Sequence, residues 1–520
     1  MIASVRALPK LAPAREAQNT SYLELLVVAV FLGAMLAANF ATAELYPRAW
    51  LDESMWVDPA INLLRHNGFT SSTWYSLTFG QFWYGNVPLY TGLIFAWAEL
   101  VGDSFTALRS LNLILISLAA LLLYWFARRT SEFLSARSRL GLLLILMLGN
   151  GVTFAYRSAR PEALCLVLFA LLLLASTLNP PLLRRGAIMA VSAILPWAGL
   201  QLVAYAVIAS GLIVLHTGRR HLQTLLWMAA GLATGLCLML AGYWATGHLE
   251  EFVISTVGSQ QALVGQVGQY IVLGDDRGPA RFTPSAIIGI LVQDPSSMFG
   301  LVAAAILLTG ARVRHATPAG YRLRAGITAG VLIPLGMFLA GKYPVYYTWM
   351  AVLPIWFLVL AALDRLDVSA RRERMIACTL LALSLLAGWP SLIGSALLEA
   401  NARDYSQVQH FVNQNIRPGQ WACISPGAYF AVIERGGVPF LCTQYATSRL
   451  APAIPQGQQQ RLSVIIAAPR DAAKIMARLP GHWVEVASLR PPQDRMSDIW
   501  WLDNETGTHS YELDAYRRAK

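Results

Sequence analysis

The stretch YLELLVVAVFLGAMLAANFATAELYPRAWLDESMWVD, residues 22–58, joins a long apolar run to the carboxylates Asp52, Glu53 and Asp58. Residues 22–43 are enough to cross a bilayer, because about 20 residues at a rise of about 1.5 Å cover a hydrocarbon core of roughly 30 Å. No small-residue cleavage site follows the run, so we interpret it as an uncleaved anchor. Asp52, Glu53 and Asp58 come directly after it, at the expected membrane surface, where carboxylates need an explanation.

The composition of the whole chain agrees with a membrane protein. Of its 520 residues, 56% are hydrophobic and 13% are charged, and the mean hydropathy is +0.49. These values exclude an ordinary soluble domain and predict an α-helical polytopic membrane protein. Pro196 and Gly199 interrupt one apolar run, which forms either two spans or tilted or re-entrant segments. We expect about eleven transmembrane helices, near residues 22–43, 110–126, 140–156, 162–178, 187–198, 200–216, 223–243, 285–309, 325–341, 345–363 and 375–397.

The basic residues lie mostly in the connections on one side of this expected bundle. The connection near 128–139, for example, holds four arginines, whereas the longer connections of the opposite side hold few basic residues. Because Lys and Arg are enriched in cytoplasmic connections, we place the first side, with the N-terminus, in the cytoplasm. The formal charge of +11 follows mostly from this bias and does not indicate nucleic-acid binding.

The same topology divides the chain into two domains. Residues 1–397 form the membrane domain, with large outer loops at 44–109 and 244–284, and residues 398–520 lie outside the cytoplasm. The tail has only short apolar runs, which predict a small α/β domain. We expect strands at 421–425, 438–442, 463–467 and 483–489, with helices at 404–415 and 470–478 between them.

Two cysteines stand in two of the expected tail strands. An oxidising compartment permits a bridge between Cys423 and Cys442, but two buried thiols are an equally acceptable prediction.

The first outer loop is long for a simple connection, and loops of this length are usually functional. Its segment 88–101 is apolar but too short to span, so we expect an interfacial helix there. Trp74, Trp83 and Tyr84 can stack on sugar rings, or can form the aromatic belt common at membrane interfaces.

Four motifs together resemble a known family. An acidic pair, Asp52-Glu53, follows the first span, and then come VPLYTGLIFAWAELVGDSFTALRSLN (87–112), YRSARPEALCLVLFALLLLAS (156–176) and GKYPVYYTWMAVLP (341–354). The set resembles the polyprenyl-phosphate-sugar-dependent glycosyltransferases of the GT-C superfamily, such as the protein O-mannosyltransferases, the 4-amino-arabinose lipid A transferase and the bacterial enzymes grouped with them. The likeness covers about residues 20–365. Glu162 departs from it, because many relatives have Asp there, and so does Asp58-Pro59, which interrupts what is often one continuous helix.

An enzyme of this kind needs a base for the acceptor hydroxyl, and a carboxylate at the membrane surface can supply it. We predict Asp52 as the catalytic base, with Glu53 assisting it or binding the acceptor. The alternative is that Asp52 caps the following helix. Asp58 competes for the capping role, because Pro59 would then stand at the first helical position. If Asp58 caps, Asp52 and Glu53 have no structural role.

The departing phosphate needs cations near the outer interface. Arg157 and Arg160 stand at one outer turn and Lys342 at another, and we predict that they bind the donor phosphate. Charges at the ends of spans can instead extend toward lipid headgroups. In supporting roles, Glu162 would orient an arginine, and Tyr343 and Tyr346 would flank Lys342.

The second outer loop offers a possible site for a divalent cation. Asp275 and Asp276 could hold Mg²⁺ or Mn²⁺ together with the first-loop acids, although a solvated turn is the simpler interpretation. The sequence has no Cys or His cluster with metal spacing and no nucleotide-binding motif.

The resemblance implies a glycosyltransferase of the cytoplasmic (inner) membrane that acts on its outer face. It would move a hexosyl or pentosyl group from a polyprenyl-phosphate carrier to an acceptor hydroxyl on a glycan, lipid or protein, with inversion. The alternative is a lipid or solute transporter or flippase without transferase activity, although such proteins usually place ionisable groups near the membrane midplane.

Overall fold

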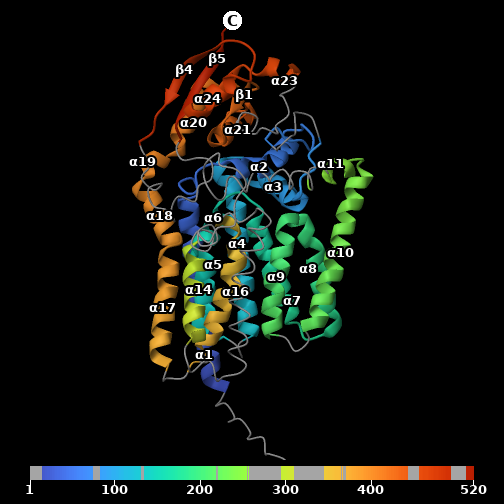
Figure 1. Ribbon diagram of the computed structural model, residues 1–520, viewed down its shortest axis with the longest axis vertical. Coiled ribbons are helices and arrows are strands. Elements are labelled where there is room, and N and C mark those ends of the chain that lie inside the picture. The colour runs from blue at the N-terminus through green and yellow to red at the C-terminus, as the bar shows by residue number, and fades with distance from the viewer. Residues whose placement is uncertain are drawn as a thin grey trace, which may run out of the picture.

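The computed structural model describes residues 14–73, 82–130, 134–217, 221–253, 256, 294–309, 345–364, 366, 370–442, 456–492 and 511–519. Long helices run side by side in one bundle, and a small sheet lies at one end of it (Figure 1). The predicted α-helical polytopic architecture with a C-terminal α/β part is therefore confirmed. The main bundle helices are α1 (Ala14–Ala41), α4 (Phe105–Arg129), α5 (Ala136–Leu148), α6 (Asn150–Arg157), α7 (Glu162–Ser176), α8 (Pro181–Ala198), α9 (Leu200–Thr217), α10 (His221–Ala245), α14 (Pro295–Thr309), α16 (Trp349–Leu363), α17 (Arg371–Leu386) and α18 (Trp389–Leu398).

Within the described ranges, four helical segments are long and apolar enough to cross a membrane, namely Tyr22–Ala41, Phe105–Arg129, Leu222–Ala245 and Arg371–Leu398. The pair α5 and α6 forms a fifth if its 54° bend belongs to one broken span. Shorter apolar helices lie among them, and α16 is buried along its whole length. The expected span at 325–341 lies outside the described residues.

The expected break near Gly199 is present. Helix α8 ends at Ala198 and α9 begins at Leu200. The amide of Leu200 donates to the carbonyl of Asn86 at 3.2 Å, which fixes this turn against the first outer loop. Residues 187–216 are therefore two helices joined by a turn.

The first outer loop carries α2 (Leu51–Leu64) and α3 (Pro88–Val101), which lie near each other at the sheet end of the bundle (Figure 1). Helix α3 matches the expected interfacial segment. Neither of the two alternative caps, Asp52 and Asp58, is present, because α2 begins at Leu51 after an extended Trp50 and continues through Pro59. Proline leaves one helical hydrogen bond unmade, and the burial of residues 53–61 holds the helix together across that gap. Asp58-Pro59 thus does not interrupt the helix.

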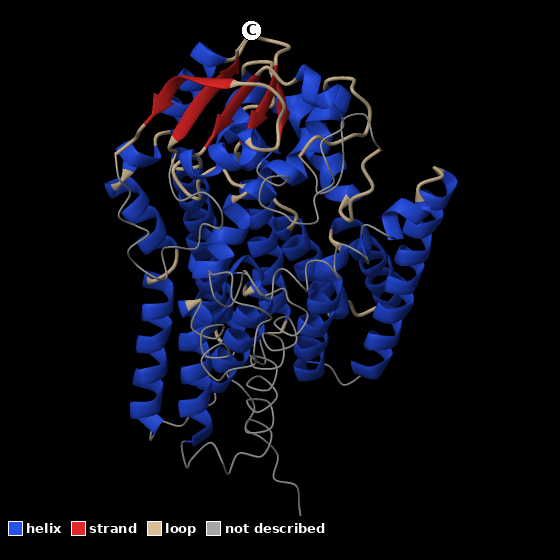
Figure 2. Cartoon of the chain, turned by 45° about the horizontal axis from the view of Figure 1, so that its top comes forward, coloured by secondary structure: helices blue, strands red, loops and turns tan. Residues whose placement is uncertain are grey.

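The tail contains a five-stranded sheet of order β2-β1-β3-β5-β4 (Figure 2). Strand β1 pairs in parallel with β2 and β3, whereas β5 pairs antiparallel with β3 and β4. The four predicted strands are present, and β5 was not anticipated, because its sequence LDAYRR carries three charges in six residues. The strands are β1 (Trp421–Ile424), β2 (Val438–Phe440), β3 (Val464–Ala467), β4 (Trp483–Leu489) and β5 (Leu513–Arg518).

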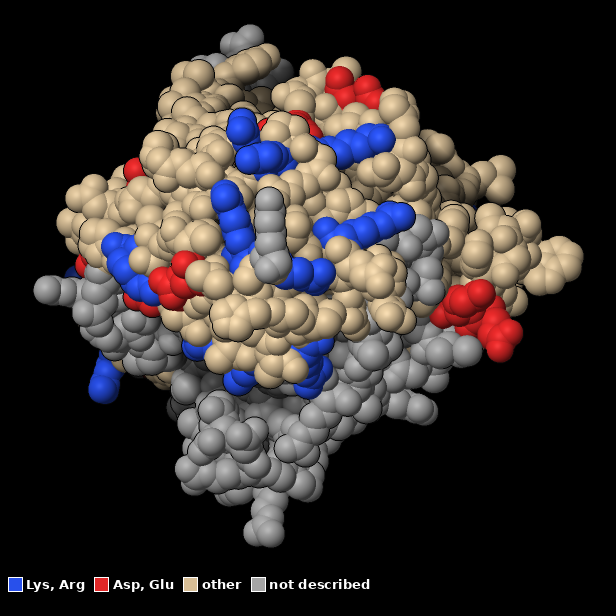
Figure 3. Space-filling view, turned by 90° about the horizontal axis from the view of Figure 1, so that it is seen from above, with Lys and Arg blue, Asp and Glu red and all other residues tan. Residues whose placement is uncertain are grey.

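The two faces of this sheet have different neighbours. Val464 and Ile466 belong to the same core as α20 (Tyr405–Asn415), α21 (Tyr429–Glu434) and the bundle. Their alternates Ile465 and Ala467 pack with α24 (Pro469–Met476) in a separate core. Successive strand residues point to opposite faces, so α24 covers the face turned away from the bundle. Figure 3, which views the molecule from the sheet end, shows several Lys and Arg side chains there.

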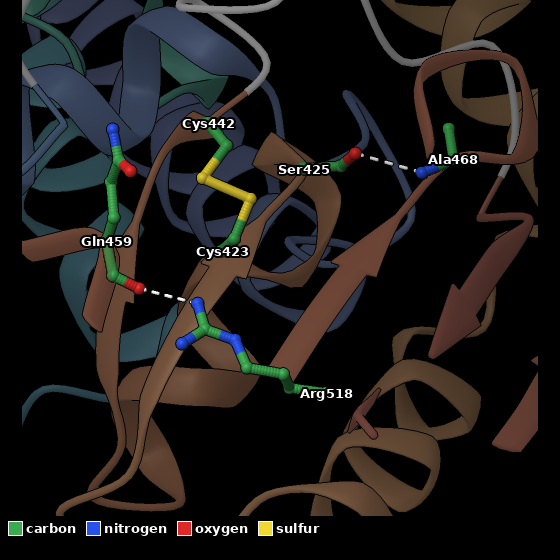
Figure 4. The surroundings of a disulfide bond; sticks show 6 residues. All are labelled: Cys423, Ser425, Cys442, Gln459, Ala468 and Arg518. Carbon is green, nitrogen blue, oxygen red and sulfur yellow. Dashed lines mark hydrogen bonds between the residues drawn. A yellow bond between two sulfur atoms is a disulfide. The ribbon is translucent and has the colours of Figure 1, made fainter. Parts of the chain in front are cut away.

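A disulfide joins Cys423 in β1 to Cys442, two residues after β2 (Figure 4). The Cα atoms of the two cysteines are 5.3 Å apart, within the usual range for a bridge. Of the two predictions for these cysteines, the bridged form is the one present.

Candidate active site

The two carboxylates of the acidic pair stand in the first turn of α2 and face different surroundings. Neighbouring helix residues are rotated by about 100° around the axis, since a turn holds about 3.6 residues. The Asp52 side chain is 25% exposed, whereas the Glu53 side chain is fully buried. One carboxylate of the pair is thus accessible and the other is not.

Asp52 is held through one of its two oxygens. Its Oδ2 accepts hydrogen bonds from Arg160 Nη1 and, at 3.2 Å, from the hydroxyl of Tyr346. Within the described part of the chain, no hydrogen bond is made by Oδ1. The carboxylate is therefore fixed in direction while one oxygen stays available to another group.

Arg160 is itself fixed from several sides. Its Nε and Nη2 donate to Glu162 at 3.1 and 2.7 Å, forming a two-pronged ion pair. Its guanidinium carbon lies 3.9 Å from the ring centre of Tyr346 and 4.9 Å from that of Trp50. Flat contacts of this kind suit the planar guanidinium and restrict its movement.

This geometry corrects the predicted role of Arg160. The side chain is 1% exposed and its fork is occupied by Glu162 and Asp52, so it orients a carboxylate and does not present donors to a phosphate. Glu162 forms the ion pair with Arg160, and Tyr346 contacts Asp52 and Arg160. Lys342, which Tyr346 was predicted to flank, lies outside the described residues.

Glu53 belongs to a second, sealed ion pair. Both of its oxygens accept from Arg109, each at 2.7 Å, and Oε1 also accepts from the amide of Ala159 at 2.7 Å. Arg109 further donates to the carbonyl of Pro47 at 2.8 Å. Glu53 thus ties α2 to α4 and to the turn before α7, and burial denies it the predicted contact with an acceptor.

Arg157 is also committed to the protein itself. Its Nε donates to the carbonyl of Tyr46 at 2.8 Å, and its other nitrogens donate to Asn39 and Thr42 at the end of α1. The side chain is 1% exposed. The predicted phosphate contact is therefore wrong for Arg157, which fastens α1 to α6.

The remaining predicted site residues are only partly described. Trp83 is fully buried and meets Phe69 edge to face at 5.1 Å, so its ring cannot stack on a sugar. Tyr84 is half-buried and packs near α10 and α11 (Leu249–Val253). Trp74, Lys342 and Tyr343 lie outside the described residues, as do Asp275 and Asp276.

Asp58 connects the far end of α2 to the tail. It is fully buried and accepts from Ser71 Oγ at 2.8 Å, from the amide of Ser72 at 2.7 Å and from the hydroxyl of Tyr429 at 3.0 Å. Burial raises the pKa of Asp58 above its usual value of 3.8, although these hydrogen bonds act in the opposite direction.

Further contacts join the tail to the same loop. The amide of Phe105 donates to Glu434 at 2.9 Å, and the ring of Phe105 stacks on Phe430 at 4.4 Å. The amide of Ala49 donates to the Tyr511 hydroxyl at 3.0 Å. The tail therefore packs directly on the helix that carries Asp52.

Sequence reasoning missed Trp50 and Asn112 and gave Arg109 no role. The indole of Trp50 donates to Ser158 at 3.1 Å, and the amide of Asn112 donates to the carbonyl of Arg160 at 2.7 Å. Arg109 did carry a signal, since it is a basic residue next to a span on the side that is poor in them.

Among the described residues, no group of three or more His, Cys, Asp or Glu side chains is placed to hold a metal ion. The predicted divalent cation therefore has no such set of ligands in these parts of the chain.

Comparison with family models and with curated proteins gives no match. Among solved structures, the chain is similar to the arabinofuranosyltransferase AftD from Mycobacteria, with a TM-score of 0.46 and 16% identity. That likeness covers 95% of this chain but only 40% of AftD. ArnT from Cupriavidus metallidurans bound to undecaprenyl phosphate gives a TM-score of 0.39 and 12% identity over 94% of this chain and 97% of ArnT.

The apo oligosaccharyltransferase of Archaeoglobus fulgidus gives a TM-score of 0.43 and 12% identity, over 86% of this chain and 70% of that one. With TM-scores below 0.5 throughout, the activity of this chain has to be argued from its own residues.

Proposed function

We propose that the protein is a membrane glycosyltransferase in which Asp52 is the catalytic base. It moves a sugar from a polyprenyl-phosphate carrier to an acceptor hydroxyl, with inversion at the anomeric carbon. The observation that carries the proposal is one partly exposed carboxylate, fixed through Oδ2 by Arg160 and Tyr346, with Oδ1 available. The motif resemblance stated above supports the class of donor.

The geometry suits proton transfer from an acceptor. A general base acts well when its receiving atom is held within hydrogen-bond reach of the hydroxyl. Arg160 and Tyr346 restrict the rotation of the carboxylate, and Arg160 is in turn held by Glu162. The Asp52 carboxylate is therefore oriented before the acceptor binds, which reduces the entropic cost of reaching the transition state.

The donor phosphate needs a cation other than the two arginines. Arg157 and Arg160 are occupied within the protein. Of the three residues predicted to bind the donor phosphate, we propose that Lys342 does so. Tyr343 stands beside it in the sequence. A lysine acts on a phosphate as a compact point charge.

We further propose that the N-terminus lies in the cytoplasm and the tail outside it, in the inner membrane. The distribution of Lys and Arg supports this orientation. The disulfide in the tail supports it independently, because such bonds persist in oxidising compartments. Helix α2, which carries Asp52, lies at the same end of the bundle as the tail, so the reaction would take place on the outer face (Figure 1).

The test is transfer of a labelled sugar in membranes supplied with polyprenyl-phosphate-linked donors. Asp52→Asn should lower the transfer rate by about 10²- to 10⁴-fold, the range for losing a general base. Asp103→Asn is the matched control, because Asp103 lies in the same outer loop, is 33% exposed and, among the described residues, pairs only with Arg65, at 3.4 Å. It should stay within about twofold of the native rate.

Two outcomes would contradict the proposal. Equal transfer rates for the native chain and Asp52→Asn would show that Asp52 is not the catalytic base. If the native chain consumes no donor but moves a lipid or solute across vesicles, the transporter prediction replaces the enzyme.

A further inference from the structure

The face of the tail turned away from the bundle carries a basic stripe on α24. Arg470, Lys474 and Arg478 are spaced by four residues and are exposed. Ala472 and Ile475, on the opposite side of the helix, are buried against the sheet. Because residues four apart lie on one helix face, Arg470 and Lys474 point away from the sheet together, and Arg478 follows in the turn after α24 ends at Met476.

This stripe leads toward a groove. Helix α24 follows β3 and returns across the sheet, so its end lies near the start of the strands. There the turn of Pro480 and Gly481, with a φ of +99° at the glycine, meets α23 (Gln456–Arg461). The groove has a volume of about 560 Å³ and is lined by Gln456, Gln459, Gln460, Pro480, Gly481 and Arg518.

The groove is lined by polar and apolar surface in similar amounts, and one hydrogen bond joins two of its lining residues. Arg518 donates to the carbonyl of Gln459 at 2.7 Å (Figure 4) and lies over the ring of Trp483 at 5.0 Å. Arg461 lies over Trp421 at 5.0 Å. The lining residues include three amides and one guanidinium and no carboxylate. Amides hydrogen-bond hydroxyls as donors and as acceptors, and guanidinium pairs with anions.

Little negative charge offsets the stripe. Asp471 lies 3.9 Å from Arg470 and neutralises part of the charge at the start of α24. Among the described residues, no ion pair joins Lys474 or Arg478 to a carboxylate. Lys and Arg side chains are prominent when the molecule is viewed from this end (Figure 3).

We propose that this surface, the basic face formed by Arg461, Arg470, Lys474, Arg478 and Arg518 with the glutamine-lined groove, binds an anionic polysaccharide. The cations would pair with carboxylate or phosphate groups along the chain, while the glutamines would bind sugar hydroxyls. A flat anionic membrane is the less fitting partner, because the amides line a recess and the three cations of the stripe are not interleaved with aromatic side chains that would enter a bilayer. The binding stands apart from the proposed sugar transfer and needs no turnover.

Several weak contacts add up on a polymer. Arg470 and Lys474 lie about 6 Å apart along α24, from four residue steps of about 1.5 Å, and Arg478 follows the helix, so neighbouring charged sugars can meet successive cations. Exposed charges interact over roughly 10 Å at 0.1 M salt, and more salt screens them. Binding should therefore weaken steeply as salt rises.

The experiment uses the full chain in nanodiscs of zwitterionic lipid and measures binding of alginate oligosaccharides by fluorescence anisotropy. Neutral dextran oligosaccharides of equal length are the comparison ligand. Lys474→Glu with Arg478→Glu should weaken alginate binding by about tenfold or more. The matched control, Lys474→Arg with Arg478→Lys, keeps both charges and should bind like the native chain. Gln459→Ala with Gln460→Ala should weaken binding several-fold without changing its salt dependence.

Each other outcome overturns the proposal. Undiminished alginate binding by the charge-reversed chain would place the ligand elsewhere. Equal binding of dextran would show that charge plays no part. If alginate fails to bind while vesicles containing phosphatidylglycerol bind through the same two residues, the surface docks on membranes. Thermal unfolding of each variant confirms that folding is unchanged, as expected for exposed positions.

Discussion

Asp52 and Glu53 are neighbours in one helical turn, and each pairs with a buried arginine, yet their surroundings differ. Asp52 shares Arg160 with Glu162 and keeps a quarter of its side chain exposed. Glu53 gives both oxygens to Arg109 and has no exposed surface. In this acidic pair one carboxylate therefore holds the helix in place, while the other stays partly exposed.

Arg157, at the end of α6, and Arg160, in the turn before α7, show the same division. Arg157 satisfies carbonyls and side chains at the end of α1, whereas Arg160 points its fork at two carboxylates. Neither is available to an incoming phosphate. Both arginines therefore hold parts of the protein in position.

The largest expected effect is a difference in stability between variants of the two carboxylates. Glu53→Gln leaves the buried Arg109 without its counter-charge and should destabilise the protein by about 3–5 kcal/mol. Asp52→Asn should cost less than about 1 kcal/mol, because Arg160 keeps its pair with Glu162. Denaturant unfolding in detergent measures both. Similar losses of unfolding free energy for the two variants would contradict the proposed division of roles.

The next effect separates the two arginines by activity. Arg160→Lys keeps the charge but loses the fork, so Asp52 is less well oriented and the turnover rate should fall about 10- to 100-fold, with little change in the donor KM. Arg157→Lys, assayed per folded molecule, is the control and should retain the native rate. A rise in the donor KM without a fall in the turnover rate would indicate that Arg160 binds the donor phosphate.

A smaller effect concerns the contact between the tail and α2. Tyr429→Phe removes a hydrogen bond to the buried Asp58 and should reduce the unfolding free energy by about 1.5–3 kcal/mol. Tyr516→Phe removes a longer, partly exposed bond to Asp514, at 3.4 Å, and should cost under about 0.5 kcal/mol. The double variant of Tyr429→Phe with Asp58→Asn should be non-additive. Additive losses would mean that the two groups do not interact.

The smallest effect is a dependence on pH at Asp58. Burial raises the pKa of Asp58 in the folded state above 3.8, so the folded form favours its proton. The stability that this group contributes is therefore complete below that pH and is lost as the pH rises through the folded-state pKa. The unfolding free energy of the native chain should fall relative to Asp58→Asn as the pH is raised from 4 to 7. If the difference in unfolding free energy between the two proteins stays constant with pH, the raised pKa of Asp58 is contradicted.

Local sequence patterns were enough to predict many elements of the fold. Apolar runs of spanning length, the break at Gly199 and the short apolar strands of the tail each depend on residues close together in the chain. The acidic pair was recognised as a candidate by its place after the first span. The start of α2 was missed, because Asp-Pro is a frequent helix start and its signal outweighed the weaker one at Trp50 and Leu51.

The partners of the charged groups could not be read from the sequence. Asp52 and Arg160 are 108 residues apart, Glu53 and Arg109 are 56 apart, and Asp58 meets Tyr429 across 371 residues. No local period links such positions, and many arrangements satisfy the same charge pattern. The sequence by itself determined a helical membrane protein with an acidic pair after its first span and a small α/β tail. Only the tertiary structure decided which carboxylate stays open, because burial and ion pairing depend on how distant segments pack.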